Sequence, residues 1–237
     1  MSTHGDIRAK QESEDISADR LGELHSLLIG WEQDNYVDFP WRSTKSRLHA
    51  LIVEVMLQRT KAEQVLPVYQ SFIEKVPDLK TPIEAGEIRQ ILWSLGLNWR
   101  IEKIIELLSF LQEKNEISNN YNELIQLPGV GDYVASAFLS LHLDIWSPLI
   151  DSNSIRLWGR VLGIETGPET RRKSSFRYLV SKITPVTNFQ IFNYAVLDLS
   201  RAVCRPKPLC NKCPLSHLCI YYKVISNGEK KKKESNI

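Results

Sequence analysis

The sequence predicts an all-α protein. Apolar residues recur at helical spacing along most of the 237 residues, and no segment shows the strict apolar–polar alternation of a half-buried strand. The connections between the helical runs are short, as they are between packed helices. Apolar residues make up 43% of the chain, which is ample for the interior of one large domain or of two small ones.

The composition limits the possible location and partners. A formal net charge of +2 is only mildly basic, so charge alone says little about nucleic acid. No apolar run approaches the roughly 20 residues that span a bilayer, and the polar N-terminal stretch lacks the apolar core of a secretory signal. We therefore expect a cytoplasmic or nucleoid-associated protein that engages no membrane. In that reducing compartment the cysteines are not expected to form disulfides.

The first part of the chain is expected to be a disordered tail followed by a helix. Residues 1–16 are charged and rich in serine, with little to bury. From Arg20 onward, large apolar residues recur at helical spacing. These residues are Leu21, Leu24, Leu27, Leu28 and Trp31. Pro40 ends the helical pattern, because it disfavours α-helical backbone at Phe39.

Most of the remaining chain is predicted to be helical. The expected helices cover residues 47–59, 62–76, 84–95, 101–113, 152–162, 169–183 and 188–203. A further short helix is expected to end with residues 124–127. Gly96 fits the position that follows a helix C-terminus.

Residues 127–131, with the sequence LPGVG, are predicted to form the turn of a helix-hairpin-helix. Gly129 and Gly131 permit a tight turn and leave backbone N–H groups unobstructed where the next helix begins, at Asp132. Unpaired amides and the helix dipole favour an anion at such a position, so the motif is expected to grip phosphate. An ordinary helix–helix turn is the alternative.

Two carboxylates are candidates for a functional site. Glu54 lies in an apolar helical run, where an unpaired acid is costly to bury. It therefore lies on a solvated edge of the helix, pairs with a distant arginine or faces a polar pocket. Asp151 follows the apolar residues 146–150 and opens the helical run 152–162. It is either an ordinary N-cap or an acid placed at a site.

Four cysteines within sixteen residues are predicted to hold a metal centre. Pro206 and Pro208 stiffen the first part of the loop that carries them. The four are Cys204, Cys210, Cys213 and Cys219. Structural zinc sites usually pair two closely spaced knuckles, whereas only Cys210 and Cys213 form one here. On spacing alone, zinc and a [4Fe–4S] cluster are nearly equal candidates.

Basic residues gather near the end of the sequence. Three of them belong to the cysteine loop and form either a second phosphate clamp or a solvated basic surface. These three are Arg205, Lys207 and Lys212. Residues 223–237 include a run of lysines and are expected to be a disordered basic tail, at most a weak electrostatic aid to binding.

Together, these motifs resemble the helix-hairpin-helix DNA glycosylases of the endonuclease III superfamily. The order is LPGVG, an apolar helix and then Asp151, eighteen residues after Tyr133. Residues 54–60, with the sequence EVMLQRT, resemble the segment of adenine and mismatch glycosylases that supplies a pocket carboxylate and a wedge residue. The resemblance covers about residues 20–222.

The resemblance implies an all-α fold of two helical lobes with a C-terminal [4Fe–4S] cluster loop. One lobe is expected to comprise residues 44–144, including the hairpin, and the other to join residues 17–43 to residues 145–222. The active cleft is expected between them. The place of the cysteine loop in the chain favours the [4Fe–4S] cluster over zinc. The first cysteine gap is five residues here and usually six in the family, which we interpret as a deletion that the loop absorbs.

The resemblance also implies roles for single residues. Asp151 is expected to face the anomeric carbon of a flipped nucleotide and to stabilise the positive charge that develops on its sugar. Glu54 is expected to touch the extruded base. Gln58, beside Arg59 on the DNA-binding loop, is expected to enter the gap left in the duplex. Bifunctional family members carry a lysine where this chain has Tyr133; a phenol cannot form their Schiff base, which implies a monofunctional glycosylase.

The implied partner is double-stranded DNA containing a mismatched or damaged base, bound by a monomer. Tyr133 together with Asp151 most resembles the thymine-DNA mismatch glycosylases, which favours thymine or uracil opposite guanine. Adenine glycosylases are the alternative, because they share residues 39–42, FPWR, and the Glu54 segment. They usually have serine in place of Tyr133 and a further C-terminal domain, whereas this chain ends eighteen residues after Cys219. A non-catalytic DNA-binding module with a redox-sensing cluster is the second alternative.

Overall fold

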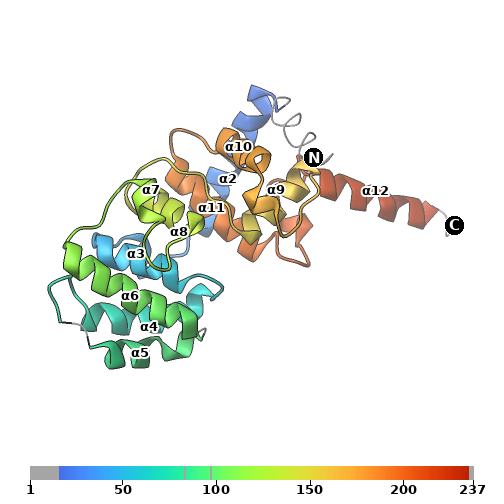
Figure 1. The fold of residues 1–237 in the computed structure, drawn as a ribbon. Coiled ribbons are helices and arrows are strands. Elements are labelled where there is room, and N and C mark those ends of the chain that lie inside the picture. Colours follow the sequence, from blue (N-terminus) through green and yellow to red (C-terminus); the bar gives the residue numbers. More distant parts are fainter. Residues whose placement is uncertain (1–15, 83, 97, 235–237) are drawn as a thin grey trace. The chain divides into compact units, whose positions relative to one another are not determined.

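The computed structural model describes residues 16–82, 84–96 and 98–234, and over these ranges the chain is helical with no β-strand. Figure 1 shows the order of the helices. The chain divides into two compact units. We call residues 37–145 the hairpin unit, and residues 1–36 with 146–237 the cysteine unit.

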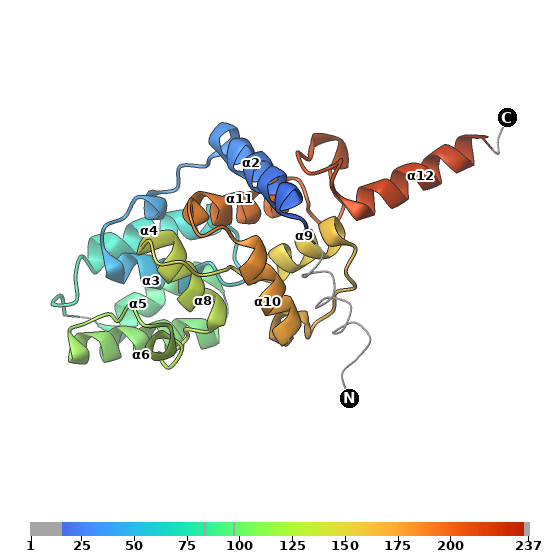
Figure 2. The ribbon, with the colours of Figure 1, turned by 90° about the horizontal axis from the view of Figure 1, so that it is seen from above.

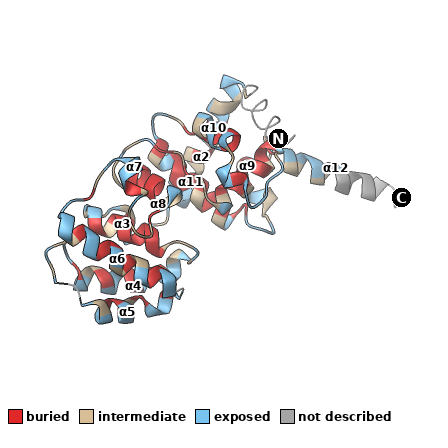
Figure 3. Ribbon diagram, viewed as in Figure 1, coloured by how far each residue is buried: buried red, intermediate tan, exposed pale blue. Residues whose placement is uncertain are grey.

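The hairpin unit is built on helix α3 (Arg47–Met56), which is almost wholly buried (Figure 3). Ser46 caps its N-terminus by accepting a hydrogen bond from the His49 amide at 3.3 Å. Helices α4, α6 and α8 pack on α3, so its apolar residues form the centre of the unit. The other elements of this unit are η1 (Pro40–Arg42), α4 (Ala62–Lys75), α5 (Ala85–Leu92), η2 (Trp93–Leu95), α6 (Asn98–Lys114), α7 (Tyr121–Leu124), α8 (Asp132–Ala137) and the π-helix η3 (Phe138–His142).

Three features of the hairpin unit differ from the sequence-based expectations. Helix α3 ends at Met56 instead of running on to residue 59, because residues 57–60 turn away. Helix α7 ends at Leu124, so residues 124–127 are mostly a turn. Residues 37–43 belong to this unit and not to the cysteine loop's lobe. The reason is apolar packing: Phe39 stacks on Trp41 with ring centroids 4.6 Å apart, inside the core of the hairpin unit.

The cysteine unit is built around helix α11 (Phe189–Ala202). Helices α2 and α9 pack against α11, and Figure 2 shows α2 lying alongside it. Trp158 of α9 stacks on Phe192 of α11 with ring centroids 6.2 Å apart. The other elements of this unit are α2 (Ala18–Asn35), α9 (Ser152–Leu162), η4 (Thr170–Arg172), α10 (Ser174–Ile183), η5 (Cys210–Lys212) and α12 (Ile220–Glu234). The expected helix at residues 152–162 is therefore confirmed.

The two expected tails have different outcomes. The predicted N-terminal tail lies outside the described residues except for Ile16, which packs on the core of the cysteine unit. Where a disordered basic tail was expected, the structure has helix α12 up to Glu234, and residues 235–237 lie outside the described residues. Lysine and glutamate have high helix propensity, which favours this continuation. No helix among the described residues is long and apolar enough to cross a membrane.

Candidate active site and cysteine centre

The two glycines of the hairpin turn differ in backbone conformation and in the space that surrounds them. Gly129 has φ +75°, and a Cβ there would meet the Cβ of Lys103 at 3.1 Å. Gly131 has φ −102° as the N-cap of α8, and a Cβ there would meet nothing within 4 Å. Gly129 is therefore required by the fold, whereas the space beside Gly131 is open on the exposed side of the turn.

The loop that follows α3 is held by the buried guanidinium of Arg100. Its Nη1 atom donates to the carbonyl oxygens of Met56, at 2.9 Å, and of Gln58, and also to Thr60 Oγ1 at 2.8 Å. Its Nη2 atom donates to the carbonyl oxygen of Leu95 at 2.7 Å. Burial lowers the pKa of Arg100 from its usual value. The cation stabilises the carbonyl-rich C-terminus of α3, where unpaired acceptors gather.

This loop presents the two predicted DNA-binding residues next to the hairpin. Arg59 is exposed and adopts the left-handed conformation, with φ 57°. Gln58 is half-buried, and its Nε2 atom donates to the carbonyl oxygen of Gly129 at 3.0 Å. The expected wedge residue and the expected phosphate-binding turn therefore touch each other, a contact that sequence spacing did not indicate.

Glu54 is buried and pairs with a histidine. Its Oε1 atom lies 2.8 Å from Nε2 of His142, and both side chains are 2% exposed. Its Oε2 atom is buried and has no hydrogen-bond partner among the described residues. Of the three environments considered from the sequence, the solvated edge is thus wrong, and the partner is not an arginine. Tyr133 belongs to the same unit: it is the second residue of α8 and packs partly buried against the core.

Asp151 is the N-cap of α9, as one of the two interpretations of the sequence predicted. Its Oδ1 atom accepts from the amides of Asn153, at 3.1 Å, and Ser154, at 2.7 Å. Its Oδ2 atom accepts from Nδ2 of Asn153 at 2.9 Å. Ser154 returns a bond by accepting from the Asp151 amide, which completes a capping box. These contacts fix the direction of a carboxylate that is only partly buried.

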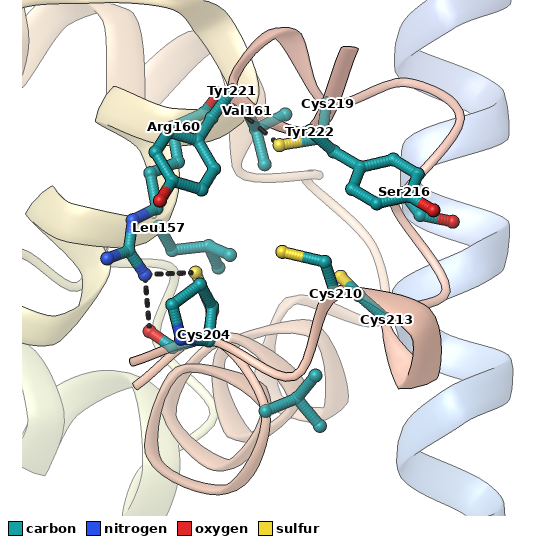
Figure 4. Close-up of a pocket in the computed structure, with 12 residues that line it drawn as sticks. Leu157, Arg160, Val161, Cys204, Cys210, Cys213, Ser216, Cys219, Tyr221 and Tyr222 are labelled. Carbon is teal, nitrogen blue, oxygen red and sulfur yellow. Dashed lines mark hydrogen bonds between the residues drawn. The ribbon is translucent and has the colours of Figure 1, made fainter. Parts of the chain in front are cut away.

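The four cysteines line a single pocket between α9 and the loop after α11, as Figure 4 shows. All four are free thiols. Burial raises the pKa of Cys213 to about 11, and it also raises the pKa values of Cys210 and Cys219. A bound metal requires thiolates, so it would release protons from these groups on binding.

Arg160 ties one side of the cysteine loop to α9. Its Nη1 atom lies 3.5 Å from Sγ of Cys204 and 2.8 Å from the carbonyl oxygen of Arg205. Its Nη2 atom donates to the carbonyl oxygen of Pro206 at 2.9 Å. The guanidinium also lies 5.0 Å from the ring centroid of Tyr221, a cation–π contact. A fixed positive charge thus stands beside one of the thiols.

The arrangement of the cysteines bears on which metal centre fits. No three His, Cys, Asp or Glu side chains of the described residues converge closely enough for a single ion. A tetrahedral zinc would hold sulfur atoms about 3.8 Å apart, given bonds of about 2.3 Å. In a [4Fe–4S] cluster each thiolate binds a different iron, so the sulfurs stand farther apart. The four thiols line one pocket, so as a donor set they fit a metal centre of either kind.

The predicted basic clamp lies on the surface of the same loop. Its three cations are all exposed, and they are Arg205, Lys207 and Lys212. Arg205 donates from Nε to the carbonyl oxygen of Lys207 at 3.2 Å, and Lys212 ends the short helix η5. Exposed cations on an ordered loop suit phosphate contact as well as plain solvation, so both interpretations remain compatible with the geometry.

Arg100 and His142 were not singled out from the sequence, although each contacts a predicted site residue. His142 interrupts the apolar stretch 138–143, which is the same kind of signal that drew attention to Glu54. Arg100 follows Gly96 and opens a helix with an ordinary amphipathic pattern, so nothing in its local sequence marks it as buried.

Known proteins similar to this chain are DNA glycosylases. A thymine-DNA glycosylase of Aeropyrum pernix is 36% identical over 215 residues, which span 86% of this chain and 96% of that protein. A thymine/uracil-DNA glycosylase of Methanothermobacter thermautotrophicus is 32% identical over 86% of this chain and 94% of that protein. An adenine DNA glycosylase of Buchnera aphidicola is 34% identical, but this chain spans only 63% of its length. No family model matches the chain.

Solved structures similar to this chain belong to the same class of protein. The structure of a thermostable thymine-DNA glycosylase matches with a TM-score of 0.79 and 27% identity, over 88% of this chain and 99% of the other. A non-covalent endonuclease III–DNA complex matches with a TM-score of 0.73 and 22% identity, over 87% and 98% of the two chains, and shows a shared fold. The chain belongs to the helix-hairpin-helix superfamily of DNA glycosylases. It is accordingly an N-glycosylase, a hydrolase of N-glycosyl bonds.

Proposed function

We propose that this glycosylase removes thymine or uracil mispaired with guanine and leaves the DNA strand uncut. The observation that carries the proposal is Tyr133 at the second position of α8, directly after the hairpin. The thymine-DNA glycosylase of Aeropyrum pernix, which matches over almost its whole length, supports the choice of base. Bases of this kind arise in DNA by deamination of 5-methylcytosine and cytosine.

The target base is reached by extruding its nucleotide from the duplex. Extrusion needs the least free energy at a mismatch, because pairing there is already weak. Gln58 fills the gap left in the duplex, and its hydrogen bond to the hairpin holds it in place for that role. The exposed amides around Gly131 bind a phosphate, and the exposed Arg59 adds positive charge beside them.

The glycosidic bond is broken with help from Asp151. Cleavage places positive charge on the sugar, and a fixed carboxylate stabilises that charge and orients water. The capping box supports this role because it fixes the direction of the carboxylate. Glu54 contacts the extruded base. Tyr133 has no amine, so no Schiff base with the sugar forms and no β-elimination follows.

The cysteine pocket holds a [4Fe–4S] cluster, with Cys204, Cys210, Cys213 and Cys219 as its ligands. The four free thiols around one pocket support this assignment. When bound, the cluster cross-links the loop and so orders it. The ordered loop then presents its three exposed cations to the phosphate backbone, as a second contact besides the hairpin. The enzyme acts as a monomer on double-stranded DNA.

Adenine is the second candidate base, because an adenine glycosylase of Buchnera aphidicola is 34% identical to this chain. The two assignments differ in the base that is released, so a panel of duplexes separates them. Purified protein is incubated with duplexes carrying G·T, G·U, A·G and thymine glycol, and the strands are analysed with and without alkali. We expect alkali-dependent breaks at G·T and G·U. Breaks at A·G alone would replace the proposed substrate by adenine.

A further inference from the structure

The buried pair of Glu54 and His142 contains an unsatisfied oxygen. Nε2 of His142 lies 2.8 Å from Oε1 of Glu54, and each side chain is only 2% exposed. Oε2 of the same carboxylate is equally buried and has no partner among the described residues. An unpaired buried carboxylate oxygen is costly, and native proteins keep few of them. A purely structural ion pair does not explain why this oxygen is left open.

The backbone carrying His142 is also unusual. His142 is the last residue of the π-helix η3, which directly continues α8. A π turn holds one more residue than an α turn, so it rotates the residues after it by about 100° relative to a continued α-helix. Element η3 packs on α3, the helix that carries Glu54. Because η3 ends this helix at His142 and packs on α3, its π geometry sets which residue meets Glu54.

We propose that His142 is a positioning residue that reserves Oε2 of Glu54 for an N–H group of the extruded base. In this arrangement His142 donates its Nε2–H to Oε1, which holds the carboxylate in one rotamer. Oε2 then remains a pure hydrogen-bond acceptor, because an ionised carboxylate has no donor. The inference deepens the proposed function and rests on it, since it concerns the base that the enzyme extrudes.

The donors and acceptors on the edge of a base decide which class of base fits the second oxygen of Glu54. Thymine and uracil are imides, with a single N3–H donor between two carbonyl acceptors. Adenine presents the ring acceptors N1 and N7 on either side of its amino group. A lone acceptor matches the single N3–H of an imide. It can also accept from the amino group of adenine, but it then lies beside the lone pair of N1 or N7, each of which would need a donor. His142 therefore favours imide bases by preventing Glu54 from acting as a donor.

Three variants test this role. His142→Phe removes the donor and keeps a ring of similar size, and His142→Gln restores an N–H donor at a similar reach. His49→Phe is the matched control: His49 belongs to the same unit, and its Nε2 contacts the carbonyl oxygen of Val76 at 2.8 Å. Each protein is measured by thermal melting, by single-turnover base release from G·U and G·T duplexes, and by binding. The binding duplexes carry 2′-fluoro-deoxyuridine, which resists cleavage, or a base-free tetrahydrofuran, each opposite guanine.

We expect His142→Phe to slow base release by about 100-fold, the effect typical of losing one preorganised polar group in an active site. Its preference for the fluorouridine duplex over the base-free duplex should fall, while binding to the base-free duplex stays within about threefold of wild type. His142→Gln should recover most of both losses. His49→Phe should lower the melting temperature and change neither rate nor preference.

Two results overturn the inference: unchanged release and preference in His142→Phe, or equal losses in His142→Phe and His49→Phe. Failure of the proposed function looks different. If the wild-type protein releases adenine alone, the imide assignment is overturned together with the proposed base. In that case, the rates of adenine release by the same variants test the positioning role of His142. If no base is released at all, the binding preference for the fluorouridine duplex still decides it.

Discussion

The two candidate carboxylates, Glu54 in the hairpin unit and Asp151 in the cysteine unit, are held in opposite ways. Asp151 is partly exposed, and both of its oxygens accept hydrogen bonds from the first turn of its own helix. Glu54 is buried, its partner His142 lies 88 residues away along the chain, and its other oxygen has no hydrogen-bond partner among the described residues. Asp151 is thus oriented by local structure, whereas Glu54 depends on the packing of two helices. In the proposed function, the local contacts of Asp151 would keep its carboxylate in a fixed direction, and the second oxygen of Glu54 would accept a hydrogen bond from the base.

The largest expected effect comes from Asp151→Asn. Asparagine is as good an N-cap as aspartate, so the melting temperature should stay within about 2 °C of wild type. The negative charge is lost, so single-turnover base release should fall by about 1,000-fold. A non-catalytic DNA-binding module would lose nothing in this variant. Equal activity in Asp151→Asn and wild type would show that Asp151 is only a cap.

Removing one cysteine ligand should affect the cysteine unit far more than the hairpin unit. We expect the purified wild-type protein to be brown, with about four irons per chain. Cys213→Ser should lose most of this iron and melt at a lower temperature, because the loop loses its cross-link. Elemental analysis measures the metal. Stoichiometric zinc with no iron in the wild-type protein would contradict the cluster assignment.

Arg100→Met should destabilise the hairpin unit by about 3 kcal/mol, because it leaves several buried carbonyl oxygens without donors. Base release from G·T should also fall, since the Gln58 loop loses its support. Arg89→Met is the matched control, because Arg89 forms an exposed ion pair with Glu102 and its loss should hardly change the free energy of unfolding. Urea unfolding of both variants measures the difference. Similar unfolding free energies for the two would remove the special role given to Arg100.

The smallest effects separate the two hairpin glycines. Gly129→Ala should destabilise the protein by about 1 kcal/mol, since alanine is strained at φ +75° and its Cβ meets Lys103 at 3.1 Å. The Cβ of Gly131→Ala meets no protein atom within 4 Å, so this variant should lose only the small N-cap preference for glycine. The added methyl group should weaken binding to mismatched and undamaged duplexes alike, because phosphate contacts carry no sequence information. A loss confined to mismatched DNA would contradict the phosphate role.

The sequence predicted what depends on local pattern and missed what depends on distant contacts. Helical periodicity predicted α9 at its observed bounds and α4 to within one residue. It extended α3 three residues too far, because the loop after Met56 is shaped by Arg100, more than forty residues later in the chain.

The candidate site shows the same division. The isolation of Glu54 among apolar residues marked it as unusual, but its partner His142 lies on a π turn that a 3.6-residue period does not describe. The cysteine spacing predicted a common centre, and the four side chains do line one pocket. The spacing left zinc and a cluster equally placed, because that choice depends on how far apart the sulfurs stand.

The central claim is that the enzyme releases thymine or uracil and leaves the strand intact. One single-turnover reaction with a G·U or G·T duplex tests it most directly. Mass spectrometry identifies the free base, and the DNA strand is examined before alkali, after alkali and after borohydride treatment. We predict free uracil or thymine, an abasic strand that breaks only with alkali, and no covalent protein–DNA adduct, because Tyr133 has no amine. Efficient borohydride trapping, or release of adenine alone from an A·G duplex, would contradict the account.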